Sequence, residues 1–367
     1  MLKFASLLAI FSVVRAARAE PAAAETVQDE KGITSSLEVR EGVKTSDISP
    51  NGKPAEDQPA EAGTDPIITD PILIRDLAAS DPDPRNLRLA GDLKKSKDAG
   101  KYDLTGLDTL RASGSSTYST RGLDAVLKRI AKASGTATGR PEVTVFDLRQ
   151  EFHGFFDGIS VSWLGTHDWS NKGKTHDEVV NGEKALLESI PGEVLIANEA
   201  DVKKFGDAAP RSSLHVSRVQ TEQEVVDAAG ASYARLTITD QMGPTPEEVD
   251  RFLEEVGKLK PGAWVHVHCH AGRGRTTTFM ILYDILRNAK QVKLEDISKR
   301  QGALAMLQGE GKDGNDFDLL NMDYDKMPEW KRQPAKDRAY FIREFSDFVL
   351  QADPLRTGIK WSNWNKR

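Results

Sequence analysis

The sequence has little of what several classes of protein require. It contains one cysteine, Cys269, among 367 residues, which excludes an intramolecular disulfide framework and a cysteine-rich zinc site. It has no uninterrupted apolar run of about eighteen residues, so we expect no membrane-spanning helix. Lys and Arg number 50 against 56 Asp and Glu, a formal net charge of −6. This balance argues against nucleic acid as a partner.

Polar residues are concentrated near the N-terminus. A short apolar stretch follows Lys3 and a small-x-small pattern ends at Ala19, which predicts a signal peptide over residues 1–19 and export to the periplasm or the medium. An ordinary buried helix is the alternative. Residues 20–65 contain no Phe, Trp or Tyr and are rich in acidic side chains, which predicts a disordered acidic tail. Residues 66–367 remain as one folded, nearly neutral domain that can hold a locally positive site.

Helical and strand patterns alternate along the folded part. Apolar residues at helical spacing predict helices over residues 122–132, 175–189, 221–229, 245–259, 275–288, 294–308 and 335–351. Short runs rich in β-branched residues predict strands over residues 143–148, 192–197, 233–238 and 263–268. Such alternation indicates an α/β protein in which helices flank a sheet.

The segment with the most chemical information is a loop between a predicted strand and the next helix. The strand ends at His268, the helix begins near Arg275, and Gly272 and Gly274 lie between them. Glycines permit a tight loop whose amide groups point inward, and the start of the helix adds partial positive charge. We therefore expect an anion cradle with Cys269 at its floor, held as the thiolate.

Phosphoryl transfer is the chemistry that these residue types support. Cys269 is placed to attack phosphorus and form a phosphocysteine, while Arg275 binds two phosphate oxygens through the transition state. Thr276 is expected to hydrogen-bond to the sulfur when it leaves. This chemistry requires no metal ion and no cofactor. The loop residues expected to contact the phosphate are His270, Ala271, Gly272, Arg273 and Gly274.

A leaving alkoxide has to be protonated, so a general acid must approach from outside the cradle. Asp240 follows a predicted strand and precedes a proline-rich helix start. We expect it to act as that acid, and then as the base for the attacking water. Two plainer interpretations stay open, in which Cys269 is a buried structural thiol at an ordinary turn and Asp240 is a helix-entry residue.

Several motifs resemble a known family. The loop from Cys269 to Thr276 resembles the Cys-x5-Arg-Ser/Thr signature of the protein tyrosine phosphatase (PTP) superfamily. Further segments resemble the bacterial cysteine phytases, which are PTP-like inositol polyphosphate phosphatases, and the resemblance covers about residues 84–350. These segments are 107–115, 146–154, 161–163 with Asp168-Trp169, 218–225, and Thr239-Asp240 with Pro244-Thr245-Pro246.

The resemblance implies a fold, a reaction and a substrate. The fold would be a PTP-like sheet flanked by helices, with a smaller partial β-barrel region at about residues 157–200. The reaction would be stepwise hydrolysis of a small polyphosphate, myo-inositol hexakisphosphate, through a phosphocysteine. Arg88 matches a substrate-binding arginine, and Asp168 matches an acid that binds an inositol hydroxyl or orients a neighbouring base.

The resemblance also suggests roles for residues outside the loop. The outer phosphates would be held by Lys204 or its neighbour Lys203, and by Lys336, with Lys331 and Arg338 nearby on the last predicted helix. Arg149 and His153 would either touch the site or have a structural role. His268 would stabilise the loop by hydrogen bonding, and His266 would belong to the core.

The sequence departs from the family pattern at three positions. The family loop usually has an acidic residue after the cysteine and an aliphatic one before the second glycine, where this chain has His270 and Arg273. The family's general acid is commonly followed by His, where this chain has Gln241. Arg273 makes the loop more positive, which suits a polyanion, while Gln241 is expected to weaken a secondary phosphate contact.

Two other functions stay open from the sequence. A secreted protein tyrosine or phosphoinositide phosphatase would share the chemistry but not the substrate. A non-catalytic phosphate-binding module would keep the cradle, yet it needs neither a nucleophile nor an acid. The joint presence of Cys269, Arg275 and Asp240 favours an enzyme.

Overall fold

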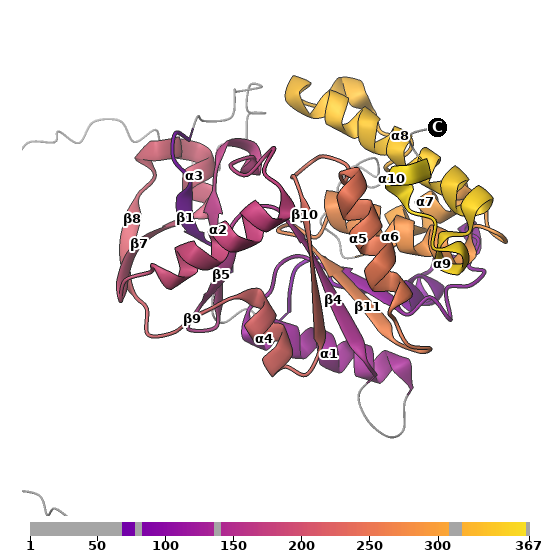
Figure 1. Ribbon diagram of the computed structural model, residues 1–367, viewed down its shortest axis with the longest axis horizontal. Coiled ribbons are helices and arrows are strands. Elements are labelled where there is room, and N and C mark those ends of the chain that lie inside the picture. Colours follow the sequence, from indigo (N-terminus) through magenta and orange to yellow (C-terminus); the bar gives the residue numbers. More distant parts are fainter. Residues whose placement is uncertain (1–67, 78–82, 136–140, 308–317, 365–367) are drawn as a thin grey trace, which may run out of the picture. The chain divides into compact units, whose positions relative to one another are not determined.

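The chain forms an α/β structure with two sheets, which confirms the predicted fold class (Figure 1). The signal peptide predicted over residues 1–19 and the acidic tail predicted over residues 20–65 lie outside the described residues. Within the described part, no helix combines the length and the apolar character needed to cross a membrane. The computed structural model describes four stretches of one compact unit, residues 68–77, 83–135, 141–307 and 318–364.

The sheet that carries the cysteine has five strands in the order β10-β4-β11-β3-β2. They are β2 (Arg88–Leu89), β3 (Ala112–Ser115), β4 (Val143–Arg149), β10 (Ser232–Ile238) and β11 (Trp264–His268). Neighbouring strands are parallel, except that β2 is antiparallel to β3. His268, the last residue of β11, pairs with Ser115 of β3 and Asp147 of β4. The carboxyl ends of parallel strands thus meet at one edge, where α/β proteins place their sites.

Helices cover both faces of this sheet. One face holds α1 (Thr120–Ser134) and α4 (Glu222–Ala228), and the other holds α5 (Pro246–Gly257), α6 (Gly274–Asn288), α7 (Leu294–Met306) and α8 (Glu329–Ala352). Successive strand residues point to opposite faces. Val145 of β4 therefore shares a core with α1, while Phe146 meets Phe252 of α5 at 5.6 Å between ring centroids.

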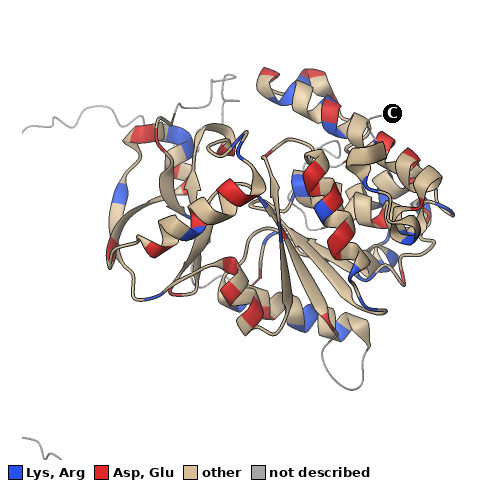
Figure 2. Ribbon diagram, in the orientation of Figure 1, with Lys and Arg blue, Asp and Glu red and all other residues tan. Residues whose placement is uncertain are grey.

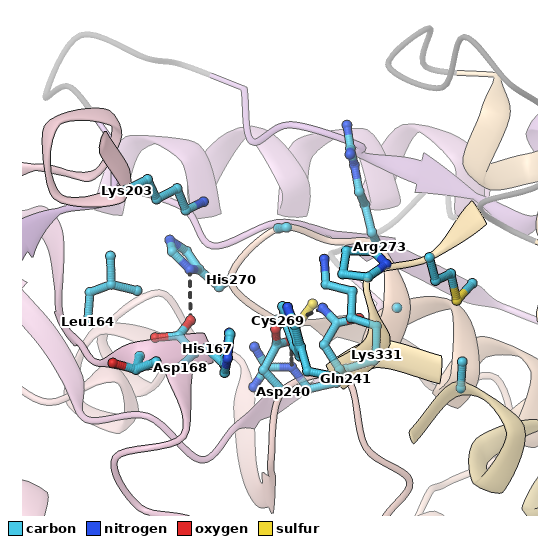
Figure 3. Close-up of a pocket in the computed structure, with 18 of the residues that line it drawn as sticks. Leu164, His167, Asp168, Lys203, Asp240, Gln241, Cys269, His270, Arg273 and Lys331 are labelled. Carbon is cyan, nitrogen blue, oxygen red and sulfur yellow. Dashed lines mark hydrogen bonds and ion pairs between the residues drawn. The ribbon is translucent and has the colours of Figure 1, made fainter. Parts of the chain in front are cut away.

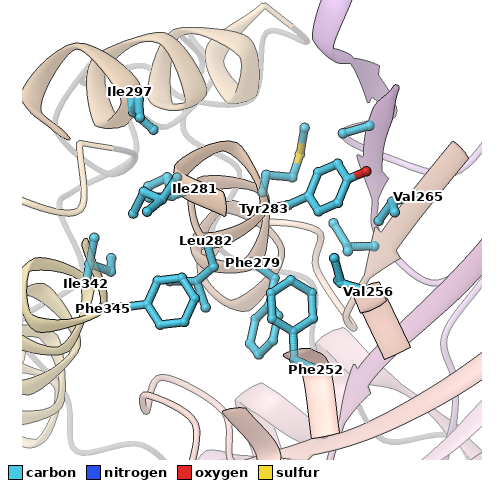
Figure 4. Packing of buried hydrophobic residues seen from close by; sticks show 14 of the residues in the cluster. Phe252, Val256, Val265, Phe279, Ile281, Leu282, Tyr283, Ile297, Ile342 and Phe345 are labelled. Carbon is cyan, nitrogen blue, oxygen red and sulfur yellow. The ribbon is translucent and has the colours of Figure 1, made fainter. Parts of the chain in front are cut away.

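The helix that follows the cysteine loop is anchored along most of its length. Residues from Phe279 to Ile285 of α6 are all buried, between α5, α7, α8 and the sheet (Figure 4). Phe279 packs edge-on against Phe252, with ring centroids 5.0 Å apart. Burying an aromatic side chain of this size stabilises the fold by roughly 2–3 kcal/mol. The start of α6 is therefore a rigid support for the loop before it.

The second sheet has six strands in the order β8-β7-β1-β6-β5-β9. They are β1 (Ile72–Arg75), β5 (His153–Phe156), β6 (Ile159–Leu164), β7 (Glu193–Asn198), β8 (Arg211–His215) and β9 (Val219–Gln220), with α2 (His176–Glu188) and α3 (Glu199–Phe205) beside them. β1 pairs antiparallel with β6 and parallel with β7. Only β6 and β7 fall inside the region 157–200, and the bounds of a partial barrel stay a prediction.

All the predicted helices and strands are present. Thr221 and Thr245 cap α4 and α5, each accepting a hydrogen bond from the amide three residues further on. The last long helix begins at Glu329 rather than near residue 335, because Pro334 is accommodated inside it at the loss of one backbone hydrogen bond. The remaining short elements are η1 (Ala90–Lys95), η2 (Ala99–Lys101), η3 (Thr166–Asp168), η4 (Gly206–Ala208), η5 (Tyr324–Lys326), α9 (Pro354–Thr357) and α10 (Trp361–Trp364).

Candidate active site

Cys269 lines a pocket of about 600 Å³ and is itself only 2% exposed. The walls of the pocket come from the loop after β11, from η3 and α3 beside the second sheet, from the turn at Asp240, and from α8 with the segment before it (Figure 3). The predicted site residues that line it are Asp168, Asp240, Cys269, His270, Ala271, Arg273, Gly274 and Arg275. The fold thus brings together residues that lie up to about a hundred positions apart in the sequence.

The cysteine loop is held from behind through its carbonyl oxygens. The donors are the amide of Thr117 to His270 (3.1 Å), the side-chain amide of Asn86 to Ala271 (2.8 Å) and the guanidinium of Arg88 to Gly272 (2.9 Å). In a trans peptide, a carbonyl and the following N–H point in opposite directions. The amides of residues 271–273 therefore point away from these donors. This is the arrangement of an anion cradle.

Gly272 is required by two features of the loop. Its φ is +71°, a left-handed conformation that other residues adopt at a cost. A Cβ at this position would lie 2.3 Å from the amide nitrogen of Ser116. The loop backbone therefore lies directly against the backbone that follows β3.

Thr276 makes the contact to sulfur that the sequence predicts. Its Oγ1 donates to Sγ of Cys269 at 3.2 Å and also lies 3.3 Å from the carbonyl oxygen of Ser115. A hydroxyl donor on sulfur stabilises the charged thiolate relative to the thiol. Thr276 is therefore placed to support Cys269 both as nucleophile and as leaving group.

Arg275 is oriented by a carboxylate that the sequence analysis did not identify. Its two Nη atoms bind Glu151 at 2.6 and 2.8 Å, and Nη1 also donates to the carbonyl of Ile238 at 3.1 Å. Burial lowers the pKa of Arg275, but Glu151 and Asp240 together raise it well above its ordinary value. The guanidinium is therefore always charged and fixed in its plane, with its Nε edge on the side of Asp240.

Asp240 lies at the mouth of the cradle. Its Oδ1 is 3.2 Å from Nε of Arg275, and its Oδ2 accepts a hydrogen bond from Gln241 at 2.8 Å. The side chain is 25% exposed, so it remains accessible from the pocket. Gln241, at φ +64°, turns the chain here.

Six buried side chains of alternating charge connect Arg275 to the second sheet, and we call them the charge chain. In order they are Arg275, Glu151, Arg149, Asp76, His270 and Asp168. The Arg149 contacts measure 2.9 Å to Glu151 and 3.3 Å to Asp76. His270 lies 3.5 Å from Asp76 through Nε2 and 3.4 Å from Asp168 through Nδ1. Buried charges require such partners.

The charge chain shifts the protonation of its members. Burial lowers the pKa of His270, but Asp76 and Asp168 raise it to about 9. Burial raises the pKa of Asp76, and the charges of Arg149 and His270 bring it below its ordinary value. Burial and the charge of Glu151 raise the pKa of Asp168. The imidazole that replaces the family's acidic residue is therefore a cation at neutral pH.

Lysine and arginine side chains outnumber acids around the pocket, although acids predominate on the outer helices α2, α4 and α5 (Figure 2). The cations are Lys203, Arg273, Arg275, Lys326, Lys331 and Arg338, against Asp168, Glu199 and Asp240. Lys203 pairs with Glu199 on its own helix. The pocket is thus a cationic recess in an acidic protein, which suits a substrate with several negative charges.

Two lysines predicted to face the pocket lie outside it. Lys204 is exposed and lies over the ring of Phe205, while its neighbour Lys203 lines the pocket. Lys336 is exposed and lies over the ring of Tyr324, while Lys331 lines the pocket. The prediction for Lys204 and Lys336 is therefore corrected to Lys203 and Lys331, because only the helix orientation decides which lysine faces inward.

Arg88 supports the loop and does not line the pocket. Its guanidinium is fully buried, and besides Gly272 it donates to the carbonyl of Asn86 at 2.9 Å and to Oγ1 of Thr277 at 3.0 Å. Burial lowers its pKa to about 10, and the negative charge of Cys269 partly opposes this. Arg88 therefore contacts the back of the cradle, and its contact with substrate stays a prediction.

Three further histidines of the region, His153, His266 and His268, are structural in this arrangement. His153 and His268 share Glu222, with Nε2 to carboxylate distances of 3.0 and 2.8 Å. His266 bonds Ser113 at 2.9 Å, and burial lowers its pKa to about 3, so it is neutral. None of these three residues lines the pocket.

Two groups of the described side chains place potential metal ligands within 4.8 Å of one another. They are Asp147 with His153 and Glu222, and Glu151 with Asp168 and His270. Arg235 contacts Asp147 at 2.9 Å, and Arg275 and Arg149 bind Glu151. Arginines thus already supply the positive charge that a cation would bring to either group.

Comparisons with known proteins agree with this geometry. The sequence model of the PTP-like phytase family matches residues 146–287, and the description of that model reads "Inositol hexakisphosphate". A PTP-like phytase from Bdellovibrio bacteriovorus is 35% identical, with a TM-score of 0.62 over 83% of this chain and 98% of that one. The chain belongs to the PTP-like phytase family.

Longer relatives contain the same unit. The PTP-like myo-inositol phosphatase of Mitsuokella multacida, solved with myo-inositol-(1,3,4,5)-tetrakisphosphate, is 33% identical with a TM-score of 0.68, over 80% of this chain and 47% of that one. The effector protein hopD2 of Pseudomonas syringae pv. tomato is 30% identical over 239 residues, 64% of this chain and 48% of its own length. The chain spans about half the length of these two relatives.

Proposed function

We propose that this PTP-like phytase removes phosphates stepwise from myo-inositol hexakisphosphate. The observation that carries the proposal is the pocket, in which Cys269 and Arg275 lie at the floor and further cations surround them. Its volume of about 600 Å³ falls within the usual range of small-molecule sites. A ring that carries several phosphates can place one of them on the cradle while Lys203, Lys331 and Arg338 meet the others.

The first chemical step forms a phosphocysteine. Sγ of Cys269 attacks phosphorus, and the bond between phosphorus and the inositol oxygen breaks. Asp240, in its protonated form, gives its proton to that oxygen, so the product leaves as an alcohol. The loop amides and Arg275 hold the phosphoryl oxygens throughout.

The second step releases inorganic phosphate. A water molecule attacks phosphorus, and the carboxylate of Asp240 accepts its proton. The phosphorus–sulfur bond breaks and returns Cys269 to the thiolate, which the hydroxyl of Thr276 stabilises at 3.2 Å. Asp240 ends the cycle protonated and ready for the next phosphate.

The test is phosphate release from inositol hexakisphosphate beside a phosphotyrosine peptide, with EDTA present. We expect strong release from the inositol substrate and little from the peptide. A preference for the peptide would keep the cysteine chemistry and overturn the substrate. Cys269→Ser should abolish turnover with an unchanged melting temperature, and retained activity in this variant would overturn the mechanism.

We also propose that the protein is exported and that residues 1–19 are removed. The support is the sequence pattern that ends at Ala19. Fractionation of cells that express the full chain, with mass spectrometry of the mature N-terminus, tests this. Recovery of uncleaved protein from the cytoplasm alone would contradict export.

A further inference from the structure

Three aromatic side chains meet at the rim of the pocket, and we call them the aromatic clasp. They are His167 of η3, Trp169 directly after it, and Trp330 in the first turn of α8. The His167 ring stacks on Trp330, with centroids 3.7 Å apart and planes at 26°. Trp169 meets both rings edge-on, at 5.1 Å from His167 and 5.5 Å from Trp330. The clasp therefore joins η3, beside the second sheet, to α8, and two of its members, His167 and Trp330, line the pocket.

The backbone under the clasp is strained. His167 and Asp168 both have positive φ, 56° and 62°. Each such residue that is not glycine costs on the order of 1–3 kcal/mol, and strain of this kind persists only where surrounding contacts fix it. The conformation directs the His167 ring to Trp330. It also directs the Asp168 carboxylate to His270, as Figure 3 shows.

The clasp is bonded to the turn that carries Asp240. Nε1 of Trp169 donates to the backbone carbonyl of Asp240 at 3.0 Å. From the other side, Arg338 of α8 approaches the carbonyl of Gln241 at 3.4 Å. Trp330 and Arg338 belong to the same helix, so α8 and η3 hold this turn between them.

We propose that the aromatic clasp positions Asp240 as the general acid, and that Trp169 and Trp330 are positioning residues. A general acid works only within hydrogen-bond reach of the leaving oxygen, and small displacements cost large factors in rate. The stack fixes α8 against η3, and the indole N–H transmits that position to the Asp240 backbone. The proposal rests on the proposed role of Asp240, but it does not depend on inositol hexakisphosphate as substrate.

The test compares leaving groups that need the acid with leaving groups that do not. Hydrolysis of para-nitrophenyl phosphate, whose phenolate leaves readily, is measured beside phenyl phosphate and an alkyl phosphate. Trp169→Phe keeps the ring and removes the N–H, and Trp330→Leu removes the stack. In both variants the ratio of kcat/KM for the aryl substrate to that for the alkyl substrate should rise about tenfold, which is part of the roughly hundredfold or larger factor that general-acid catalysis supplies.

Two controls separate positioning from folding. Trp264→Phe also removes an indole hydrogen bond, 3.0 Å to Ser113, at the far end of β11, and should leave the ratio unchanged. In an Asp240→Asn background, the clasp variants should add no further change to the ratio, because the group that they position is absent. Melting temperatures identify any variant that fails to fold, and Trp169→Phe is the conservative member of the pair.

The outcomes are distinct. Equal losses across all leaving groups, additivity with Asp240→Asn, or an unchanged ratio in Trp169→Phe would each overturn the proposal. A wild-type enzyme that hydrolyses aryl and alkyl phosphates but not inositol hexakisphosphate would overturn the proposed substrate instead. The leaving-group comparison would still decide the role of the clasp.

Discussion

Arg275 shows how a single side chain is prepared for its task before substrate arrives. Glu151 binds both Nη atoms, and the carbonyl of Ile238 accepts from one of them. A donor that is already oriented needs no reorganisation when charge develops on the phosphate. Glu151 therefore belongs to the site, although it lies outside the loop.

Gly272 is the loop position where a methyl group is least tolerated. We expect Gly272→Ala to lower kcat by at least about tenfold and stability by about 1–3 kcal/mol, because its Cβ would meet the Ser116 amide at 2.3 Å. Steady-state kinetics and thermal unfolding measure both effects.

The matched control is Gly262→Ala, which also has a positive φ, +86°, but has nothing within 4 Å of the added Cβ. It shares the backbone strain and lacks the steric clash, so it should lose stability without losing kcat. A Gly272→Ala enzyme no worse than this control would show that the loop can move away from Ser116.

Lys331 and Lys336 form a matched pair on one helix. Lys331 lines the pocket and Lys336 lies over Tyr324 outside it. Removing one charge opposite a phosphate costs about 1 kcal/mol, so Lys331→Ala should raise KM for inositol hexakisphosphate about fivefold. Lys336→Ala should leave KM unchanged. Equal KM values for the two variants would place the outer phosphates elsewhere.

At the scale of elements, the charge chain links the end of β1 to the five-stranded sheet, because Asp76 contacts Arg149 of β4 and His270 after β11. Asp76→Asn would leave Arg149 and His270 each with one carboxylate fewer in a buried position. Breaking a buried ion pair on one side costs about 3–5 kcal/mol, so we expect a loss of that order in chemical denaturation. Asp70→Asn, at an exposed position before β1, is the control. A loss below about 1 kcal/mol would mean that water replaces the carboxylate.

The sequence predicted the long elements well and the short strands poorly. The apolar spacing in α1, α5 and α6 was sufficient to place them, since these helices bury a continuous face. β3, with sequence ASGS, lies fully buried between β11 and β2 but carries no β-branched or aromatic residue. Its small side chains make room for α6, because a Cβ on Gly114 would lie 2.6 Å from Thr276. Such a strand has no local signal.

The chemistry of the loop was readable from the sequence, but its supports were not. Cys269, Arg275 and Thr276 are neighbours in sequence, so their spacing alone indicates a phosphate site. Glu151 lies within the motif 146–154, but its contact with Arg275 and the approach of Asp76 depend on how the strands pair, which no local pattern reveals. Arg88 was recognised as relevant, yet only the fold shows that it contacts the loop from behind.

At the scale of the whole molecule, buried titrating groups predict how stability depends on pH. Burial lowers the pKa of His153, but Glu183 raises it to about 10, and the pKa of His270 is raised to about 9. The contribution of these two histidines to the free energy of unfolding is therefore complete below about pH 6.5 and is lost as pH rises through those values. Burial raises the pKa of Glu222, but the charge of His268 and hydrogen bonds from His153 and His268 lower it to about 2. The contribution of Glu222 to the free energy of unfolding is therefore lost as pH falls from 4.5 toward that value.

His266 adds to the loss of stability at low pH. Burial lowers its pKa from 6.5 to about 3, so the unfolded chain takes up this proton first and stability falls as pH drops below about 6.5. The melting temperature should therefore be highest near pH 6.5 and fall on both sides. His270→Gln should flatten the alkaline side, and His215→Gln, on the exposed strand β8, should not. A wild-type curve that stays level up to pH 10 would contradict the assignment of charged, paired histidines.

The residues of the charge chain are synthesised in a fixed order. A ribosome releases Asp76, Arg149, Glu151 and Asp168 well before His270 and Arg275. In that interval Arg149 is the one cation of the charge chain that is available to its three carboxylates. Emergence of the cysteine loop supplies both missing cations together. The charge chain and the loop that carries Cys269 are therefore completed in the same late step of synthesis.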